Sequence, residues 1–208
     1  MWLFVLIIII LLPLAIFIKW KLPFLTGRIG ESFISGKLFQ LSPAHYKVLN
    51  NLLLPSRGHS ETTQIDHVIV SNFGVFCIET KAYSGWIFGN AYQKYWMQVI
   101  FRYKKRFYNP LRQNYAHVKA VEDLIKPYYP KLSVISFIAF PHADKLKISG
   151  TDLVGYMRDV VNKIKGFTNQ ILSDTERDNI YGILERTNIQ NKEVRKSHDR
   201  TVKDLKRY

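Results

Sequence analysis

The chain has 208 residues and carries 30 lysines and arginines against 16 aspartates and glutamates, so its formal net charge is +14. This surplus favours polyanionic partners, either nucleic acid or the anionic surface of a membrane. Hydrophobic residues make up 47% of the chain, which excludes intrinsic disorder, and the single cysteine excludes an internal disulfide framework and any multi-cysteine metal site.

Residues 1–18 contain neither a charged nor a polar side chain. As a helix they would span roughly 27 Å, at about 1.5 Å per residue, against a membrane hydrocarbon core of about 30 Å. Trp2 and Trp20 lie at the two ends of the stretch, where indole rings favour the boundary between membrane and water. The sequence therefore predicts a transmembrane helix over 1–18, followed by a juxtamembrane linker over 19–29.

Two alternatives to a membrane anchor are a cleaved signal peptide and a buried core helix. A signal peptide would need a basic start and a small-residue cleavage site, and neither is evident. A core helix is rarely apolar on every side for this length. Basic residues follow the stretch and none precedes it, so we expect a single-pass membrane protein whose C-terminal domain is cytoplasmic.

After the linker, apolar residues at helical spacing predict a helix over 30–41, and the next β-rich run, 46–54, predicts a strand. The runs 63–70 and 75–81 flank the turn signal SNFG and predict a hairpin. Residues 84–101 predict one or two short strands about a turn at Gly89 and Asn90.

Asn109 followed by Pro110 is the pattern of an N-cap with proline in the first helical position, so a helix is predicted from there to the residue before Pro127. Further along we predict, in order, a strand buried on both faces over 132–140, a helix over 152–165, a helix opened by the Ser173 to Glu176 capping box, and a fraying basic tail over 188–208. This order predicts an α/β (α+β) fold, a mixed β-sheet flanked by helices.

The predicted hairpin places charged side chains on one patch. If the turn is centred between Asn72 and Phe73, Asp66 faces Glu79; a turn shifted by one residue would instead place Asp66 opposite Lys81. Glu79 and Lys81 are two residues apart and share a strand face in either register. Two carboxylates and an ammonium group are therefore expected to converge.

Two carboxylates so close together repel and would share a proton, a conflict that a divalent cation removes. Oxygen ligands of this kind select Mg²⁺ or Mn²⁺, and such an ion activates water and polarises a phosphoryl oxygen. Lys81 would then stabilise the developing negative charge, so the group suits phosphodiester hydrolysis. An ordinary cross-strand salt bridge on a solvated face is the alternative, and the D-x₁₂-E-x-K spacing alone does not exclude it.

Other residues are candidates for the same site. Gln113, on the first turn of the Asn109-capped helix, could position a phosphate or a water, and Glu31 could supply a third carboxylate; each could instead be an ordinary first-turn residue. Of the nearby residues that could react or bind metal, we interpret His67 as structural, His117 as an outer-shell candidate and Cys77 as core packing.

A basic and aromatic stretch follows the hairpin, and it could neutralise phosphates and stack bases on Tyr103 or Tyr108. The alternative is a solvated hairpin tip. The candidate nucleic-acid-binding residues are Arg102, Lys104, Lys105, Arg106 and Arg112.

An ordered set of short motifs resembles the nuclease-related domain (NERD) family, placed within the PD-(D/E)xK nuclease superfamily. The motifs are GE at 30–31, YKVL at 46–49, QIDHVIV at 64–70, FGVF at 73–76, IETK at 78–81, GWIFG at 85–89, Trp96 and NPLRQN at 109–114. The resemblance covers about residues 26–140. It implies a restriction-endonuclease-like core, here assigned to 30–140. Beyond the resemblance, the residue pattern itself predicts a C-terminal helical extension over 141–187 and the basic tail over 188–208.

The resemblance also implies Mg²⁺-dependent cleavage of nucleic acid, DNA in the first instance. The family's active-site pattern falls on Glu31, Asp66, Glu79, Lys81 and Gln113, with the metal held by Asp66, Glu79 and the carbonyl of Thr80. The sequence thus predicts a membrane-anchored, metal-dependent nuclease. A non-catalytic membrane tether for nucleic acid is the first alternative, and a structural membrane protein with simple salt bridges at these residues is the second.

Overall fold

The computed structural model describes residues 38, 40–57 and 61–205. The predicted anchor over 1–18, the linker over 19–29, Glu31 and most of the helix predicted over 30–41 lie outside the described residues. Within the described part of the chain, no helix is both long enough and apolar enough to cross a membrane.

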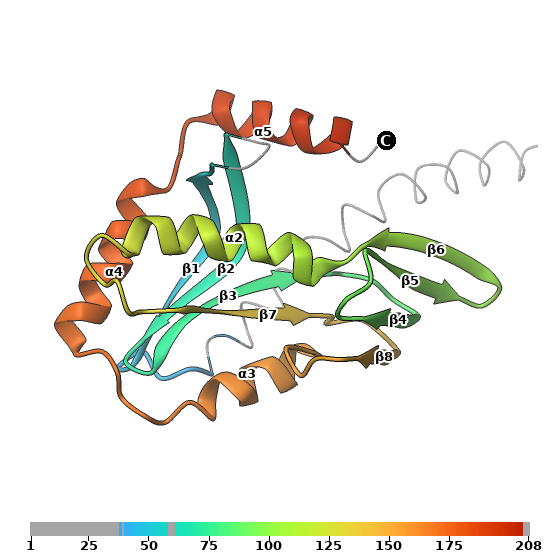
Figure 1. The fold of residues 1–208 in the computed structure, drawn as a ribbon, viewed down its shortest axis with the longest axis horizontal. Coiled ribbons are helices and arrows are strands. Elements are labelled where there is room, and N and C mark those ends of the chain that lie inside the picture. Colours follow the sequence, from blue (N-terminus) through green and yellow to red (C-terminus); the bar gives the residue numbers. More distant parts are fainter. Residues whose placement is uncertain (1–37, 39, 58–60, 206–208) are drawn as a thin grey trace, which may run out of the picture.

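The described residues form a mixed α+β fold with two mixed sheets and four helices (Figure 1). The first sheet has the strand order β1-β2-β3-β7-β9. Its first three strands are antiparallel, whereas β7 and β9 join in parallel. The bounds are β1 (Tyr46–Pro55), β2 (Thr62–Ser71), β3 (Gly74–Thr80), β7 (Val134–Ala139) and β9 (Val154–Gly155). The predicted hairpin and the predicted buried strand are therefore confirmed.

The second sheet has the order β6-β5-β4-β8 and lies at one end of the molecule, beyond the carboxyl ends of β3 and β7 (Figure 1). Strands β4, β5 and β6 form an antiparallel meander, and β8 pairs with β4 in parallel. The bounds are β4 (Trp86–Asn90), β5 (Tyr95–Ile100), β6 (Tyr103–Tyr108) and β8 (Lys145–Ser149).

The turn predicted at Gly89 and Asn90 is wrong, because both residues belong to β4. A Cβ atom at Gly89 would lie 2.3 Å from the indole ring of Trp96, so this glycine allows a close approach of strand and ring. The Trp96 indole N–H donates to the Asn90 carbonyl at 2.9 Å. The chain reverses only after Asn90.

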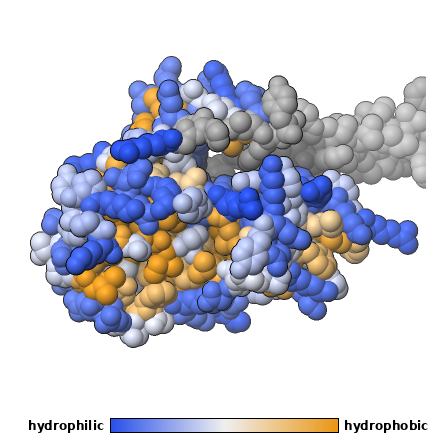
Figure 2. Space-filling view, viewed as in Figure 1, coloured by the Kyte–Doolittle hydropathy of each residue, from blue (hydrophilic) through white to orange (hydrophobic). Residues whose placement is uncertain are grey.

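Helices cover both faces of the first sheet (Figure 1). Helices α2 (Pro110–Ile125) and α4 (Asp174–Thr187) pack on one face, in a core that includes Val121 and Ile180. Helix α3 (Met157–Lys165) packs on the other face, in a core that includes Phe76 and Leu38. Figure 2 shows a hydrophobic band between α2 and α3 on the viewed face.

The start and end of α2 agree with the sequence prediction. The side chain of Asn109 accepts a hydrogen bond from the backbone N–H of Leu111 at 2.9 Å, Pro110 takes the first helical position, and the helix ends at Ile125. The Asn109 amide also donates to the carbonyls of Ala91 and Gln93. The residue that caps α2 therefore ties it to the turn between β4 and β5.

Beyond residue 140, the helices predicted over 152–165 and from the Ser173 capping box are present as α3 and α4, whereas two strands and a last helix were not predicted. Strand β8 joins the second sheet, and β9 joins the first sheet just before α3 begins. Residues 192–205 form a fourth helix, α5 (Lys192–Leu205), in place of the predicted fraying. This helix is held because the Asn191 side chain caps it and Arg195 donates to the carbonyls of Asn51 and Ile189.

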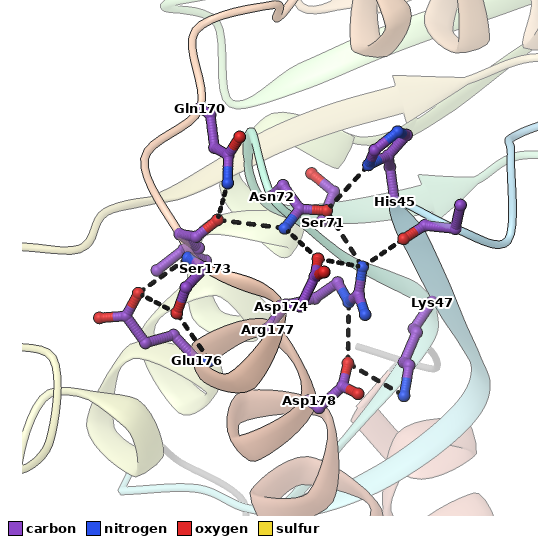
Figure 3. Close-up of polar contacts among 12 residues, drawn as sticks. His45, Lys47, Ser71, Asn72, Gln170, Ser173, Asp174, Glu176, Arg177 and Asp178 are labelled. Atoms are coloured by element: carbon purple, nitrogen blue, oxygen red, sulfur yellow. Dashed lines mark hydrogen bonds and ion pairs between the residues drawn. The ribbon is translucent and has the colours of Figure 1, made fainter.

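A polar cluster fastens α4 to the tip of the β2–β3 hairpin (Figure 3). The guanidinium of Arg177, only 7% exposed, donates to the carbonyl of Ala44 and to the side chains of Asn72 and Asp174. Asn72 in turn donates to the carbonyl of Leu172 at 3.1 Å. One buried cation therefore satisfies acceptors from three segments that are distant in the sequence.

Replacing Arg177 by methionine should lower the free energy of unfolding by about 2–3 kcal/mol, because the buried acceptors of Ala44 and Asn72 lose their donor. Urea denaturation of the full chain measures the change. The matched control is Arg186→Met, an exposed position on the same helix, where we expect a change within about 0.5 kcal/mol. Equal losses in the two variants would contradict the assigned role of the cluster.

Candidate active site

The β2–β3 hairpin has the first of the two registers considered. His67 pairs with Ile78 and Ser71 pairs with Gly74, so Asp66 and Glu79 occupy the next opposed positions. The ladder ends at the His67–Ile78 pair, one step short of the two carboxylates. The two strands therefore separate where the acidic residues lie.

The register with β1 also omits Asp66. The register with β1 passes from Asn50–His67 to Leu52–Ile65, and the residue between them, Asn51, has a φ of 54°. This left-handed conformation interrupts the strand opposite Asp66. Both ladders thus omit Asp66, and its carboxylate instead accepts the Thr80 backbone N–H at 2.7 Å.

Glu79 lies at the centre of the site. One carboxylate oxygen accepts from the Lys81 ammonium at 2.6 Å and from the Gln113 amide at 2.8 Å. The Gln113 carbonyl oxygen also accepts from Lys81 at 2.8 Å, so the three side chains form a closed triangle. The Glu79 side chain is 5% exposed and that of Lys81 is 16% exposed, which removes most solvent screening from the ion pair. Three of the predicted site residues are therefore in direct contact.

His117 contacts the other oxygen of Glu79. Its Nε2 atom lies 3.3 Å from Glu79 Oε2, and its Nδ1 atom lies 2.7 Å from the Thr63 hydroxyl. Gln113 and His117 are one turn apart on α2, which is the spacing that brings both to one carboxylate. The sequence prediction of His117 as an outer-shell residue matches this position.

Sequence reasoning missed the part played by Asn114. Its amide donates to the carbonyls of Cys77 and Phe137 and to the Ser136 hydroxyl, all at 2.7–3.2 Å. These bonds attach α2 to β3 and β7 directly beside Gln113. The sequence offered one signal: Asn114 is an amide at helical spacing from Val118 and Val121, on the face of the helix that packs against the sheet.

The two carboxyl groups have opposite pKa shifts. Burial, reinforced by the negative charge of Glu79, raises the pKa of Asp66 from 3.8 to about 7. Burial alone would also raise the pKa of Glu79, but its contact with His117 and the charge of Lys81 outweigh burial and hold that pKa below its ordinary value. The site therefore contains one carboxylate and one carboxyl group that retains its proton close to neutral pH.

His67 and Cys77 take the structural places predicted for them. His67 is buried, its ring contacts the Asn50 side chain at 2.7 Å, and burial lowers its pKa to about 4. Cys77 is fully buried in the core beneath α2, and burial raises the pKa of its thiol, which keeps it un-ionised.

The donors near Asp66 and Glu79 are the hard oxygens that Mg²⁺ or Mn²⁺ prefers. Thr80 adjoins them through its backbone N–H, which donates to Asp66, and its buried hydroxyl makes no hydrogen bond. Over residues 38, 40–57 and 61–205, no group of three His, Cys, Asp or Glu side chains is arranged to hold a metal. Within the described residues, Asp66 and Glu79 are therefore the acidic side chains that would face such a cation, and a third protein carboxylate would have to come from outside them.

The predicted nucleic-acid-binding residues lie on or beside the β5–β6 hairpin. Four of them are exposed near its tip and along β6: Arg102, Lys104, Lys105 and Arg106. Arg112, on the first turn of α2, donates to the Tyr92 carbonyl at 2.9 Å. It also lines an open pocket of about 430 Å³ together with Tyr108, Leu111 and Tyr115.

These features define a mixed α+β protein with a polar site of two carboxyl groups, an ammonium and an amide at the end of its first sheet. The model of the nuclease-related domain family, NERD, matches residues 26–141, more than half of the chain. The chain belongs to this family, as the motifs predicted, and its function is thereby nuclease-related.

The chain is also similar to two individual proteins. An uncharacterized protein of Bacillus anthracis, pXO1-01, is 36% identical over 190 residues, which cover 91% of this chain and 89% of that protein. A crystal structure of a protein of unknown function, AF1548, is 13% identical with a TM-score of 0.31, over 70% of this chain and 71% of the other.

Asp66→Asn should be more stable than the wild type at neutral pH when divalent cations are removed with EDTA. Because the folded chain keeps the Asp66 proton up to about pH 7 whereas the unfolded chain releases it near 3.8, rising pH favours unfolding across this window. The advantage of Asp66→Asn should therefore increase from about pH 4.5 to about pH 7.5 in urea denaturation.

Other groups do not obscure this comparison. The lowered pKa of His67 makes stability fall as the pH drops below 6.5, and that of Glu79 makes it fall below 4.5, but both groups remain in both proteins. Asp152→Asn, at an exposed position, is the control and should show no such trend. A constant difference between Asp66→Asn and the wild type would show that the Asp66 pKa is not raised.

Proposed function

We propose that this protein is a membrane-anchored, metal-dependent nuclease that hydrolyses phosphodiester bonds in nucleic acid. The observation that carries the proposal is the contact among Glu79, Lys81 and Gln113, with Asp66 hydrogen-bonded to the adjacent Thr80. Membership of a nuclease-related family supports it. The five-stranded mixed sheet, with Asp66 in the middle of β2 opposite Glu79 near the end of β3, supports a restriction-endonuclease-like core.

In this proposal Asp66, Glu79 and the Thr80 carbonyl hold Mg²⁺ or Mn²⁺, and Glu31 completes the acidic set. A divalent cation supplies Lewis acidity at such a site, lowering the pKa of water and polarising a phosphoryl oxygen. Asp66 would bind such a cation as a carboxylate, without the proton that burial and the negative charge of Glu79 otherwise keep on it. With Glu79 serving as a metal ligand, the Lys81 ammonium, which donates to Glu79 and Gln113 in this structure, would face the reacting phosphate.

The remaining side chains act by hydrogen bonding. Lys81 donates to the attacking water and steadies the negative charge that develops on phosphorus oxygens. Gln113 donates a hydrogen bond to a phosphate or a water from the first turn of α2, where backbone N–H groups also favour a phosphate. His117 and Asn114 hold Glu79 and α2 in place and do not touch substrate.

The apolar stretch over 1–18 supports the membrane anchor in this proposal, and the basic residues after it support a cytoplasmic nuclease domain. The net charge of +14 favours nucleic acid as the partner of that domain, with DNA as the first substrate to test.

Lys81→Ala should abolish cleavage without unfolding the protein. The full chain, purified in a neutral detergent, is incubated with plasmid DNA and with single-stranded DNA or RNA, with Mg²⁺ or with EDTA. We expect Mg²⁺-dependent cleavage by the wild type and a fall of about 100-fold or more in Lys81→Ala and Asp66→Asn. Melting curves establish that the variants are folded.

The matched control is Lys119→Ala, which removes a lysine of α2 that also pairs with a glutamate, Glu122, at 2.7 Å. This variant should cleave as fast as the wild type. Binding of nucleic acid without cleavage under any of these conditions would favour the non-catalytic tether, and equal rates in all variants would reject the assigned site.

Mg²⁺ should also stabilise the folded protein. At ten to one hundred times its dissociation constant, a ligand that binds only the folded state adds about 1.4–2.7 kcal/mol to the free energy of unfolding. Thermal denaturation should therefore shift upward with Mg²⁺ for the wild type and for Asp152→Asn. Asp66→Asn and Glu79→Gln should show little shift, and an equal shift in all four proteins would contradict cation binding by this pair.

A further inference from the structure

The second sheet has one face turned away from the protein core. Its inner face is formed by residues such as Ile87, Trp96 and Phe107, which are buried against Phe140. Side chains alternate between the faces of a strand, so Trp86 and Phe88 of β4 lie on the opposite, outer face. No helix among residues 38, 40–57 and 61–205 packs on the second sheet with more than marginal contact.

Aromatic rings and cations are paired on this outer face. The Lys147 ammonium lies 4.8 Å from the ring centroid of Trp86 and 5.1 Å from that of Phe88, and Lys145 lies 5.3 Å from Trp86. Across the sheet, the Arg106 guanidinium lies 4.9 Å from the ring of Tyr95. The outer face therefore has rings on its central strands β4 and β5, and cations on its edge strands β6 and β8.

Positive charge predominates around these rings, although the exposed Asp144 precedes Lys145. The chain from 80 to 121, which supplies three of the four strands, contains no aspartate or glutamate. Figure 2 shows hydrophilic residues bordering a hydrophobic patch at this end of the molecule. Such a surface is complementary to a ligand that carries both flat apolar groups and regularly spaced negative charges.

We infer that the outer face of the second sheet binds a single-stranded segment of nucleic acid. Bases stack on Trp86, Phe88 and Tyr95, and phosphates are contacted by Lys145, Lys147 and Arg106. A side-chain ring can stack only on a base whose face is uncovered. In a duplex the neighbouring base pairs cover these faces, so the ligand is single-stranded. The inference rests on the proposed function for its choice of nucleic acid as the ligand class, and it adds a binding surface outside the site of Asp66 and Glu79.

The lysines that cover these rings do not prevent stacking. Lysine has a long flexible stem, so its ammonium can leave the ring face and follow the phosphate next to the stacked base. The centroids of Trp86 and Phe88 are 6.2 Å apart on one strand, which presents two successive ring faces along β4. A strand of nucleic acid lying along the sheet would meet both.

A lipid surface is the competing occupant, and the exposure of the rings argues against it. Trp86 and Tyr95 are only 44% and 43% exposed and lie beneath cations, whereas a lipid-inserting side chain projects from the surface. Phe101, at the tip of the β5–β6 hairpin, does project and is 99% exposed, but it lies outside this set of paired rings and cations.

The test measures binding in EDTA, so that cleavage plays no part. A fluorescently labelled oligothymidylate of about 20 nucleotides is titrated with the full chain in neutral detergent micelles, and anisotropy reports affinity. Trp86→Ala should weaken binding by about fivefold to a hundredfold. Lys145→Gln combined with Lys147→Gln should reduce the slope of log affinity against log salt by about 0.7 for each phosphate that is no longer neutralised.

Matched controls lie on other elements. Tyr128→Ala removes an aromatic ring that is 68% exposed beyond the end of α2, and the pair Lys163→Gln with Lys165→Gln removes two lysines of α3. These controls should bind as the wild type does. The same oligonucleotide annealed to its complement should bind more weakly than the single strand and should be insensitive to Trp86→Ala.

Each other outcome is decisive. Unchanged single-strand affinity in Trp86→Ala and in the lysine pair would overturn the inference, even if the wild type cleaves DNA. If Trp86→Ala and the lysine pair bind mixed micelles containing phosphatidylserine more weakly than the wild type does, but bind the oligonucleotide equally well, the face binds lipid. That outcome would also overturn the inference. Conversely, Lys81→Ala should bind the oligonucleotide normally, so a chain that binds as expected but never cleaves would refute the proposed function alone.

Discussion

The buried carboxylate of Glu79 is the group around which the end of the first sheet is built. A negative charge at the end of an apolar strand is costly unless polar groups compensate it; here an ammonium and an amide donate to it, and an imidazole nitrogen lies 3.3 Å away. These groups come from the residue two positions along the chain and from two successive turns of α2. The position of α2 on the sheet and the position of Lys81 after β3 are therefore coupled to one charge.

The neighbouring acid lies in a contrasting environment. Asp66 is omitted from both strand ladders, and its carboxylate accepts the Thr80 N–H, which leaves it with capacity for another ligand. The two acids differ in ionisation because they have different partners: Lys81 and His117 lower the pKa of Glu79, whereas burial raises that of Asp66. Pairs of titratable groups whose environments separate their pKa values are characteristic of reactive sites.

Much of this arrangement could be predicted from local signals. The hairpin register follows from a short turn and an alternating pattern, and the start of α2 follows from Asn109 and Pro110, because each depends on residues close together in the chain. The contact of Gln113 with Lys81 could be predicted once the start of α2 was known. The spacing of Gln113 and His117 already placed both on one helix face.

Features that depend on distant partners were not predictable in this way. The interruption at Asn51 is set by a left-handed residue on the strand that faces Asp66, and no local pattern marks it. The pairing of β8 with β4 joins segments about sixty residues apart. Helix α5 is held by contacts to Asn51 and Thr62, which lie far from it in the sequence. Short amphipathic or polar segments become strands or helices there because tertiary contacts outweigh their weak intrinsic preference.

The cap of α2 has a mechanical consequence for the whole molecule. The Asn109 side chain holds the first turn of that helix with its oxygen and the turn between β4 and β5 with its nitrogen. Gln113 follows one turn later and reaches the ion pair at the end of β3. A displacement of the smaller sheet would therefore be transmitted through the Asn109 amide, together with the bond from Arg112 to the Tyr92 carbonyl, to the helix that supports Glu79.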